Sequence, residues 1–283
     1  MSGQHAGVQA FIQCAYKNAQ YVHCYAHQLN LIVGQATSQN QQVRVFFSNL
    51  RDITNFFNKS PQRIVVLDET VRKRIPHGST TRWNFKSRTI NTVYEYREQL
   101  IECMGKIEST SKQAVAINQA GAIRRMLEDS KFVFWLTVFH NIMPHVDVLY
   151  NQLQKTRTDA ALIRKQVNVF QQSLERERKR MDTVTKDISA SYETLRKRKG
   201  ENIHINRTVA AREICDVISN QIKEIYFSLL CCFSPRSSKI PGVREKFPTQ
   251  ILDQTTDVYS MLQKDRLKTE LGVIYRRSEF RNI

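Results

Sequence analysis

Residues 21–36, YVHCYAHQLNLIVGQA, bring together side chains that could bind metal or act as nucleophiles: His23, Cys24 and His27. A structural zinc site needs four ligands, which typically arrive as two spaced pairs. On a strand, His23 and Cys24 would point to opposite faces. The remaining histidines are scattered along the chain, and Cys14 belongs to a different predicted element. We therefore expect no metal site at this cluster.

Patterns for catalysis are weak as well. The sequence contains no Walker A loop, no G-x-S-x-G and no G-x-G-x-x-G. A cysteine such as Cys24, packed among Tyr and Val at a strand end, is more often buried than reactive. Asp68 and Glu69 follow the apolar RIVVL and are the best candidate ligands for a two-metal site. We do not expect them to form one, and the sequence predicts no catalytic residue and no cofactor.

A second informative stretch is GSTTRWNFKSRTINTVYEYREQL, residues 78–100. Arg82 and Trp83 lie at the start of a predicted helix, and Lys86 and Arg88 follow within the next turns. An aromatic ring flanked by cations can stack a displaced base while the cations hold its phosphates. Alternatively, the tryptophan anchors the core and the cations lie on the surface. Both interpretations stay open at this point.

Charge is the strongest compositional signal. The 43 Lys and Arg outnumber the 26 Asp and Glu, so the formal net charge is +17. A polyanion partner is the natural inference, because neutralising phosphates supplies most of the non-specific affinity for nucleic acid. We expect DNA to bind the basic surface. The alternative is a solvated basic surface without a specific partner, which also describes the runs LERERKRMD and LRKRKG.

Other compositional features narrow the class of protein. No run of about 18 apolar residues is present, so no membrane-spanning helix and no membrane partner are expected. The beginning of the chain lacks the basic and apolar regions of a secretory signal. The six cysteines show no framework-like spacing, which favours free thiols in a reducing compartment.

Apolar residues that recur every three or four positions predict helices along most of the chain. The exception is a short strand predicted from Gln20 to Cys24. Pro144 should end or kink its helix. A four-and-three seam from Leu149 to Leu174 predicts one long helix with a packed face. The predicted helices cover residues 7–19, 27–37, 43–57, 83–107, 132–150, 209–233 and 251–275.

Two of these stretches are similar to a known family. HCYAHQLNLIVGQA resembles the Cys-x-x-His-x-x-Asn-Leu segment of hAT-superfamily transposases and their domesticated relatives. TTRWNFKSRTI resembles the Arg-Trp motif that opens the helical insertion domain of those proteins. The two motifs occur in the expected order. The similarity is closest to the transposase-like region of zinc-finger MYM-type, TTF-type and DUF4371-containing proteins.

The resemblance implies a fold. The family has an RNase H-like α/β core whose Asp-Asp-Glu triad binds two Mg²⁺, with a helical insertion before the final Glu. On this basis residues 1–75 are a partial RNase H-like core with few strands, and residues 76–283 are a large all-helical insertion. The chain as a whole would be α-rich α/β. The triad carboxylates are expected to lie outside this chain, since Arg277–Phe280 only echoes the family's last Glu segment.

The resemblance also implies roles for individual residues. Cys24 and His27 would be remnants of the active-site lining. Arg82 and Trp83 match the position that stacks an unpaired base, and Lys86 and Arg88 would add phosphate contacts.

We therefore predict a catalytically inactive, nuclear fragment of a domesticated hAT-type transposase that retains nucleic-acid binding. The alternative is a helical scaffold that binds a protein partner or forms homo-oligomers. Unpaired sheet edges in a partial core would make the isolated chain marginally stable.

Overall fold

The computed structural model describes residues 7–16, 24–76, 83–155, 160–192 and 201–233, together with Asp253, 263–266 and 268–269. These parts are 89% helix and contain no strand. Chain contacts define two compact units. One is Cys24–Tyr226, and the other combines Met1–His23 with Phe227–Ile283. The predicted boundary between residues 75 and 76 falls inside the first unit.

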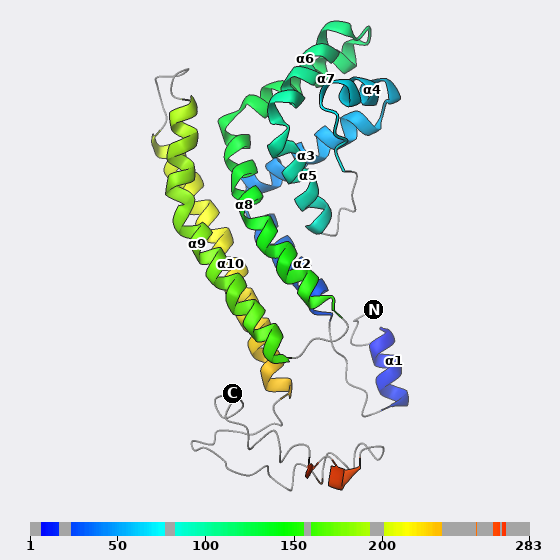
Figure 1. Cartoon of the computed structure of the whole chain (residues 1–283), viewed down its shortest axis with the longest axis vertical. Coiled ribbons are helices and arrows are strands. Elements are labelled where there is room, and N and C mark those ends of the chain that lie inside the picture. The colour runs from blue at the N-terminus through cyan, green and yellow to red at the C-terminus, as the bar shows by residue number, and fades with distance from the viewer. Residues whose placement is uncertain are drawn as a thin grey trace. The chain divides into compact units, whose positions relative to one another are not determined.

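The predicted α-rich α/β fold, with its partial RNase H-like core, is wrong for the part of the chain that the structure describes. Three helices follow one another there instead (Figure 1): α2 (Tyr25–Gln39), α3 (Gln41–Asn58) and α4 (Pro61–Thr70). Of the predicted strand only Cys24 lies within the described residues, and it is the extended residue before α2. The described ranges hold no strand and therefore no exposed sheet edge, so the reason given for a marginally stable chain does not apply to them.

Helix α4 was not predicted, and it contains both candidate metal ligands, Asp68 and Glu69. Pro61 stands in its first turn, where a missing N–H costs nothing. Asp68 and Glu69 therefore lie in the last turns of a helix rather than at a strand end. Asp68 accepts two hydrogen bonds from the guanidinium of Arg74, at 3.2 and 2.9 Å. Its partner is thus a neighbouring cation.

The next part of the unit is built around α8. The helix predicted from 83 to 107 is broken at Tyr96 into two, and α7 was not predicted. Pro144 does not end α8, because the residues around it, Ile142, Met143 and Val146, are buried at 0–1% exposure. Their packing outweighs the hydrogen bond that proline removes. The helices are α5 (Trp83–Glu95), α6 (Arg97–Thr110), α7 (Ala114–Glu128) and α8 (Ser130–Leu153).

Helix α8 is the core element of this unit. It packs against α9, α5, α2, α7 and α3. Phe46 of α3 stacks on Phe139 of α8, with ring centroids 5.4 Å apart, and also contacts Phe132. Among the described helices, α8 alone is long and apolar enough to cross a membrane by length and composition, and 56% of its most apolar window is buried by its neighbours. Packing against other helices accounts for that composition.

The predicted continuous seam is interrupted. Leu149 and Leu153 belong to α8, which ends at Leu153, whereas Val167, Phe170 and Leu174 belong to α9 (Ala160–Tyr192). All five are buried, so their apolar character was interpreted correctly. The prediction of one continuous helix was wrong, because these residues belong to two helices that pack against each other. The seam is therefore filled within the fold.

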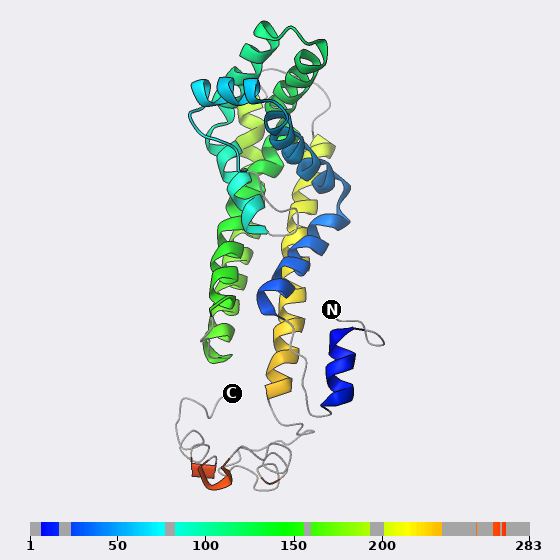
Figure 2. The ribbon, with the colours of Figure 1, turned by 90° about the vertical axis from the view of Figure 1, so that its right-hand side faces the viewer.

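Helices α9 and α10 (Glu201–Phe233) run antiparallel. Figures 1 and 2 both show α10, coloured yellow to orange, as one unbroken helix. The pairing follows from polar contacts. Gln171 Nε2 donates to the Ser219 carbonyl at 3.2 Å, and the hydroxyls of Thr185 and Thr208 lie 2.7 Å apart. Arg178 adds a bond to Asp216 at 2.7 Å.

In the other unit, α1 (Val8–Ala15) begins after Gly7. It confirms the helix predicted from the apolar spacing near the start of the chain. Four of its apolar or flanking aromatic side chains are exposed: Val8, Phe11, Ile12 and Tyr16. The helix predicted over residues 251–275 lies mostly outside the described residues; within it, Asp253, 264–266 and 268–269 are helical.

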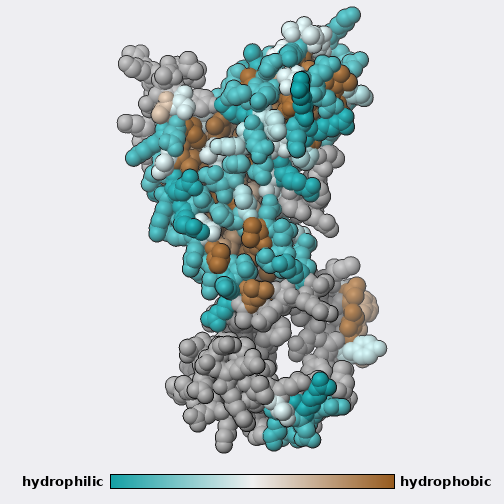
Figure 3. Space-filling view, in the orientation of Figure 1, coloured by the Kyte–Doolittle hydropathy of each residue, from teal (hydrophilic) through white to brown (hydrophobic). Residues whose placement is uncertain are grey.

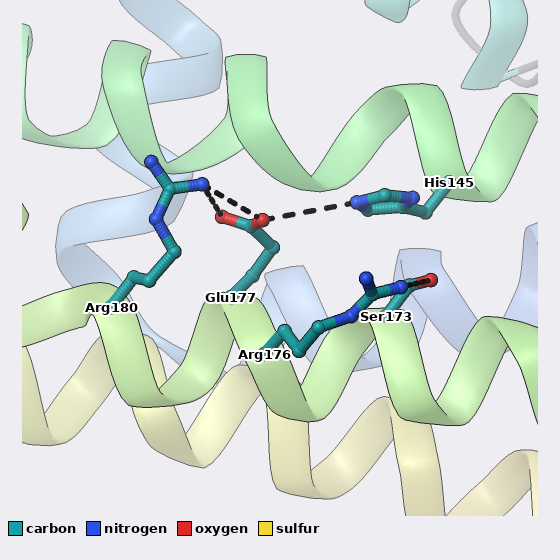
Figure 4. Close-up of polar contacts among 5 residues, drawn as sticks. All are labelled: His145, Ser173, Arg176, Glu177 and Arg180. Carbon is teal, nitrogen blue, oxygen red and sulfur yellow. Dashed lines mark hydrogen bonds and ion pairs between the residues drawn. The ribbon is translucent and has the colours of Figure 1, made fainter.

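Glu177 lies on the buried face of α9, where the three-and-four spacing of the helix would place an apolar residue. Glu177 lies three residues after Leu174, and its side chain is only 10% exposed. Figure 4 shows it between the side chains of Arg180 and His145. Arg180 donates to both carboxylate oxygens, at 3.2 and 3.4 Å, and Nε2 of His145 lies 3.9 Å away across the α8–α9 interface. Both partners keep substantial contact with solvent.

We expect Glu177→Leu to raise the free energy of unfolding by about 1 kcal/mol, because desolvating a buried carboxylate commonly costs more than its ion pairs return. Urea denaturation monitored by circular dichroism measures the change. Glu175→Leu is the matched control: Glu175 is half-exposed and pairs with Lys179, so no gain is expected. Destabilisation by Glu177→Leu would contradict the prediction.

Arg72 has a left-handed backbone, with φ of 56°, just after Val71 ends α4. A side chain in this conformation costs about 1 kcal/mol relative to glycine. We therefore expect Arg72→Gly to raise the free energy of unfolding by up to about 1 kcal/mol. Lys73→Gly removes the same charge without that relief and should not stabilise. Equal effects of the two variants in thermal denaturation would refute this.

Candidate anion-binding site

Trp83 joins the two sequence stretches that carry the family resemblance. Its indole Nε1–H donates to the backbone carbonyl of Asn30 at 3.0 Å, and its backbone N–H donates to Oδ1 of the same residue at 3.4 Å. The second bond gives a partner to a helix-start N–H that lacks one within the helix. Gly34, one turn further along α2, lies so close that a Cβ there would be 3.9 Å from Nε1. The indole thus packs directly on the α2 backbone.

The ring of Trp83 is a core group. It is 3% exposed and meets Phe47 of α3 edge to face, with centroids 5.3 Å apart. Phe47 in turn contacts Phe139 of α8 at 4.8 Å. This arrangement matches the alternative interpretation, in which the tryptophan anchors the core. Stacking of a nucleic-acid base on this ring would require the ring to leave its place between α2, α3 and α5.

Lys86 lies one turn along α5 from Trp83 and covers the same aromatic pair. Its Nζ is 4.0 Å from the centroid of the Trp83 ring and 5.1 Å from that of Phe47. Partial burial lowers the pKa of Lys86, and the charge of Arg51 on α3 lowers it further. Arg51 follows Phe47 by one turn of α3, which brings a second cation to the same place. Sequence reasoning missed Arg51, because its relevance depends on how α3 and α5 pack.

The described residues supply neither of these two cations with a carboxylate partner. No ion pair forms to Arg51 or Lys86 within that part of the chain, and Arg51 donates only to the Ser48 hydroxyl, at 3.4 Å. The first turn of α5 carries no acidic residue. Two like charges held together near a helix start attract anions, because Coulomb attraction and the helix dipole act in the same direction. Arg51 and Lys86 form what we call the cation pair site, in which Lys86 covers Phe47 and Trp83.

Beneath this site, α5 is tied to α8. The hydroxyl of Ser87, 1% exposed, donates to Oδ2 of Asp147 at 2.5 Å. Burial raises the pKa of Asp147, while the bond from Ser87 and the charge of Arg88 lower it in part. Burial prevails. Keeping the Asp147 carboxylate charged therefore costs free energy of folding. Its bond to Ser87 joins α8 to the turn of α5 that bears Lys86.

The remaining predicted site residues are spread more widely. Arg88 is exposed on α5, and Arg82 lies outside the described residues. Cys24, before the start of α2, and His27 in its first turn are both exposed. A role for these four residues in nucleic-acid binding, or as the lining of a former active site, stays a prediction.

Four cysteines of the described ranges are free thiols: Cys14, Cys24, Cys103 and Cys215. Burial raises the pKa of Cys103 to about 11 and that of Cys215 to about 12, so neither is a nucleophile at neutral pH. Within the part of the chain that is described, no three His, Cys, Asp or Glu side chains gather as they would around a metal ion.

Comparison with known proteins adds no identification. No model of a protein family matches the sequence, and no solved structure matches the chain.

The Ser87–Asp147 anchor predicts opposite results for two substitutions. Asp147→Asn keeps an acceptor for Ser87 and removes the charge, so the free energy of unfolding at neutral pH should stay equal or rise. Asp147→Ala leaves the buried hydroxyl without its acceptor and should cost about 1 kcal/mol. Urea denaturation of both variants at neutral pH makes the comparison.

The pH dependence has a definite sign. Because the folded-state pKa of Asp147 is raised, its contribution to stability is fully present below the unfolded value near 3.8 and is lost as pH rises through the folded-state value. The wild-type protein should therefore lose stability relative to Asp147→Asn as pH rises through that window. A constant difference between the two across it would contradict the assignment.

Proposed function

We propose that this chain binds nucleic acid through backbone phosphates, and that the cation pair site is a principal contact. The observation that carries the proposal is the placement of Lys86, which covers the Trp83 and Phe47 rings, and whose pKa is lowered by partial burial and, to a smaller extent, by the charge of Arg51. Like charges brought together cost free energy in the unbound protein. A phosphate between them would turn that repulsion into two charge-assisted contacts, which are the stronger class of hydrogen bond.

The charge balance of the whole chain supports a polyanion as the ligand. With a net charge of +17, long-range attraction favours an extended polyphosphate over a neutral surface. The face of the molecule in Figure 3 is mostly hydrophilic, with separate small hydrophobic patches among the described residues. A mostly polar surface of this kind suits contact with a phosphate backbone.

The basic run on α9 is a weaker candidate for the same role, because its charges are largely satisfied within the chain. Arg178 pairs with Asp216, Lys179 with Glu175, and Arg180 with Glu177. Each such pair must be broken or shared before the cation contributes to binding. A phosphate meets no such competition from the described residues at Arg51 and Lys86.

Because Trp83 is buried, the proposal rests on phosphate contacts and not on base stacking. It therefore favours binding with little dependence on base sequence, since phosphates carry no direct sequence information. Descent from an hAT-type transposase, absence of catalysis and a nuclear location remain hypotheses. The bond between Asn30 and Trp83 supports the first of these, because it brings the two resembling stretches into contact.

A protein-interaction or homo-oligomeric scaffold is the second hypothesis. The seam that suggested it is filled by the packing of α8 and α9, so that seam no longer supports it. It remains untested.

The test is a salt titration of binding to a fluorescently labelled DNA duplex, followed by anisotropy. We expect Arg51→Gln/Lys86→Gln to weaken binding and to reduce the slope of log Kobs against log salt by about 1 to 2. The matched control is Lys106→Gln/Lys179→Gln, which removes the same charge from lysines already paired with glutamates. Equal losses in the two double variants, or no binding by the wild-type protein at low salt, would overturn the proposal.

A further inference from the structure

Tyr94 is an exposed aromatic side chain near the end of α5, the helix that carries Lys86. Among the described Phe, Tyr and Trp side chains of the unit Cys24–Tyr226, it alone is exposed, at 40%. Exposure by itself does not indicate a site, because isolated apolar side chains are common on protein surfaces. The distinguishing feature of Tyr94 is the way in which its ring is held.

The ring of Tyr94 lies flat against the imidazole of His140 on α8. The two ring centroids are 3.8 Å apart, and the ring planes differ by only 7°. Asn91, one turn earlier on α5, holds the imidazole, because its Oδ1 lies 3.1 Å from Nδ1 of His140. The imidazole thus covers one face of the Tyr94 ring. Since the side chain is still 40% exposed, its open surface lies on the other face and at the ring edge.

The helices on either side of this stack are joined at a second place. The hydroxyl of Ser87 donates to Asp147, and the contact of Asn91 with His140 follows one turn later on α5. The Tyr94 ring is therefore fixed in position before any ligand arrives. A side chain that is already ordered loses little conformational freedom on binding, so a second flat group can stack on it at low entropic cost.

Charge determines which flat group suits this ring. The net charge of +17 favours a polyanion as the partner of the whole chain. Glu95, the next residue after Tyr94, is exposed and would repel a phosphate placed at the ring itself. A neutral nucleobase whose backbone lies elsewhere satisfies both conditions. Every base has a π-face, so stacking of this kind tolerates any base sequence.

The cation pair site lies on the same helix, within reach of a short strand. Tyr94 follows Lys86 by about two turns of α5, which is about 12 Å along the helix axis and about 80° around it. At about 3.4 Å per stacked nucleotide, this rise corresponds to roughly three or four nucleotides. One strand can therefore place a phosphate at Lys86 and a base at Tyr94.

We propose that the open face of Tyr94 stacks an unpaired base of a single-stranded nucleic acid whose phosphates contact the cation pair site. This inference rests on the proposed function and adds the class of nucleic acid. A base inside a duplex is stacked between its neighbours and offers no free face, whereas a single strand does. The buried ring of Trp83 offers no free face either.

The first test uses the wild-type full chain and two labelled DNA single strands of equal length. One carries its bases, and the other has abasic sites in the middle, so that the two have the same number of phosphates. We expect the strand with bases to bind about tenfold more tightly at the same salt concentration, because stacking of one base contributes at least this factor. Equal affinity for the two strands in fluorescence anisotropy would overturn the proposal.

Variants assign the effect to Tyr94. Tyr94→Ala should bind the strand with bases about tenfold more weakly, with an unchanged slope of log Kobs against log salt, because no charge is lost. Tyr94→Phe keeps the ring and should bind like the wild-type protein. Tyr16→Ala is the matched control, since it removes an exposed tyrosine of the other unit and should leave binding unchanged. Wild-type affinity in Tyr94→Ala would overturn the proposal, as would an equal loss for single strand and duplex.

The salt slope separates this proposal from the proposed function. A reduced slope in Arg51→Gln/Lys86→Gln together with unchanged binding by Tyr94→Ala would refute the stacking site and leave the cation pair site in place. Weakened single-strand binding by Tyr94→Ala with an unchanged slope in the double variant would refute the cation pair site and support stacking at Tyr94. Absence of any binding by the wild-type protein at low salt would overturn both. If circular dichroism shows that Tyr94→Ala has lost its helices, the comparison of the two strands on the wild-type protein decides the proposal.

Discussion

The indole of Trp83 determines where α5 lies against α2 and α3, and the candidate site depends on that placement. One residue of α2, Asn30, accepts both N–H groups of the tryptophan, one from the ring and one from the backbone. A large buried aromatic side chain contributes several kcal/mol to stability, and its N–H needs a partner when it is buried. The contact therefore fixes both the position and the rotation of the first turn of α5. Lys86, one turn further, then covers the exposed side of the aromatic pair and approaches Arg51.

The same placement explains why a repulsive pair of cations can persist. The aromatic contacts between α3, α5 and α8 and the Ser87–Asp147 bond hold the helices that carry Arg51 and Lys86. The free energy of that packing outweighs the modest repulsion between two partly solvated charges. If the proposed function holds, an anion bound between the two charges would offset this repulsion.

Helical periodicity was the part of the fold that the sequence allowed to be predicted. The spacing predicted helices over 27–37 and 43–57, and the structure has helices there, in which Leu29, Ile32 and Phe46 are buried. The partial α/β core came from the family resemblance, and the structure contradicts it over residues 24–76. Apolar runs such as RIVVL are ambiguous between a strand and a buried helix, since periodicity cannot separate them when they are short. The break at Tyr96 and the end of α8 at Leu153 were missed because tertiary packing, and not spacing, sets such boundaries.

The candidate site was predictable only in part, for a similar reason. Trp83 and Lys86 were identified as an aromatic side chain with neighbouring cations, but the pattern cannot tell which of them faces the core. In the structure the Trp83 ring is buried and the Lys86 ammonium covers it. The ring therefore supports the lysine and does not offer a free face for a base. Arg51 comes from α3, far from Lys86 in the sequence, so the motif around Trp83 does not indicate it. The run of cations on α9 is visible in the sequence, yet three of its members pair with carboxylates. Arg51 and Lys86 come from different helices, and the described residues give neither of them an ion pair. For a basic helical protein, the pairing of each cation is therefore a better guide to its ligand than the number of cations in a segment.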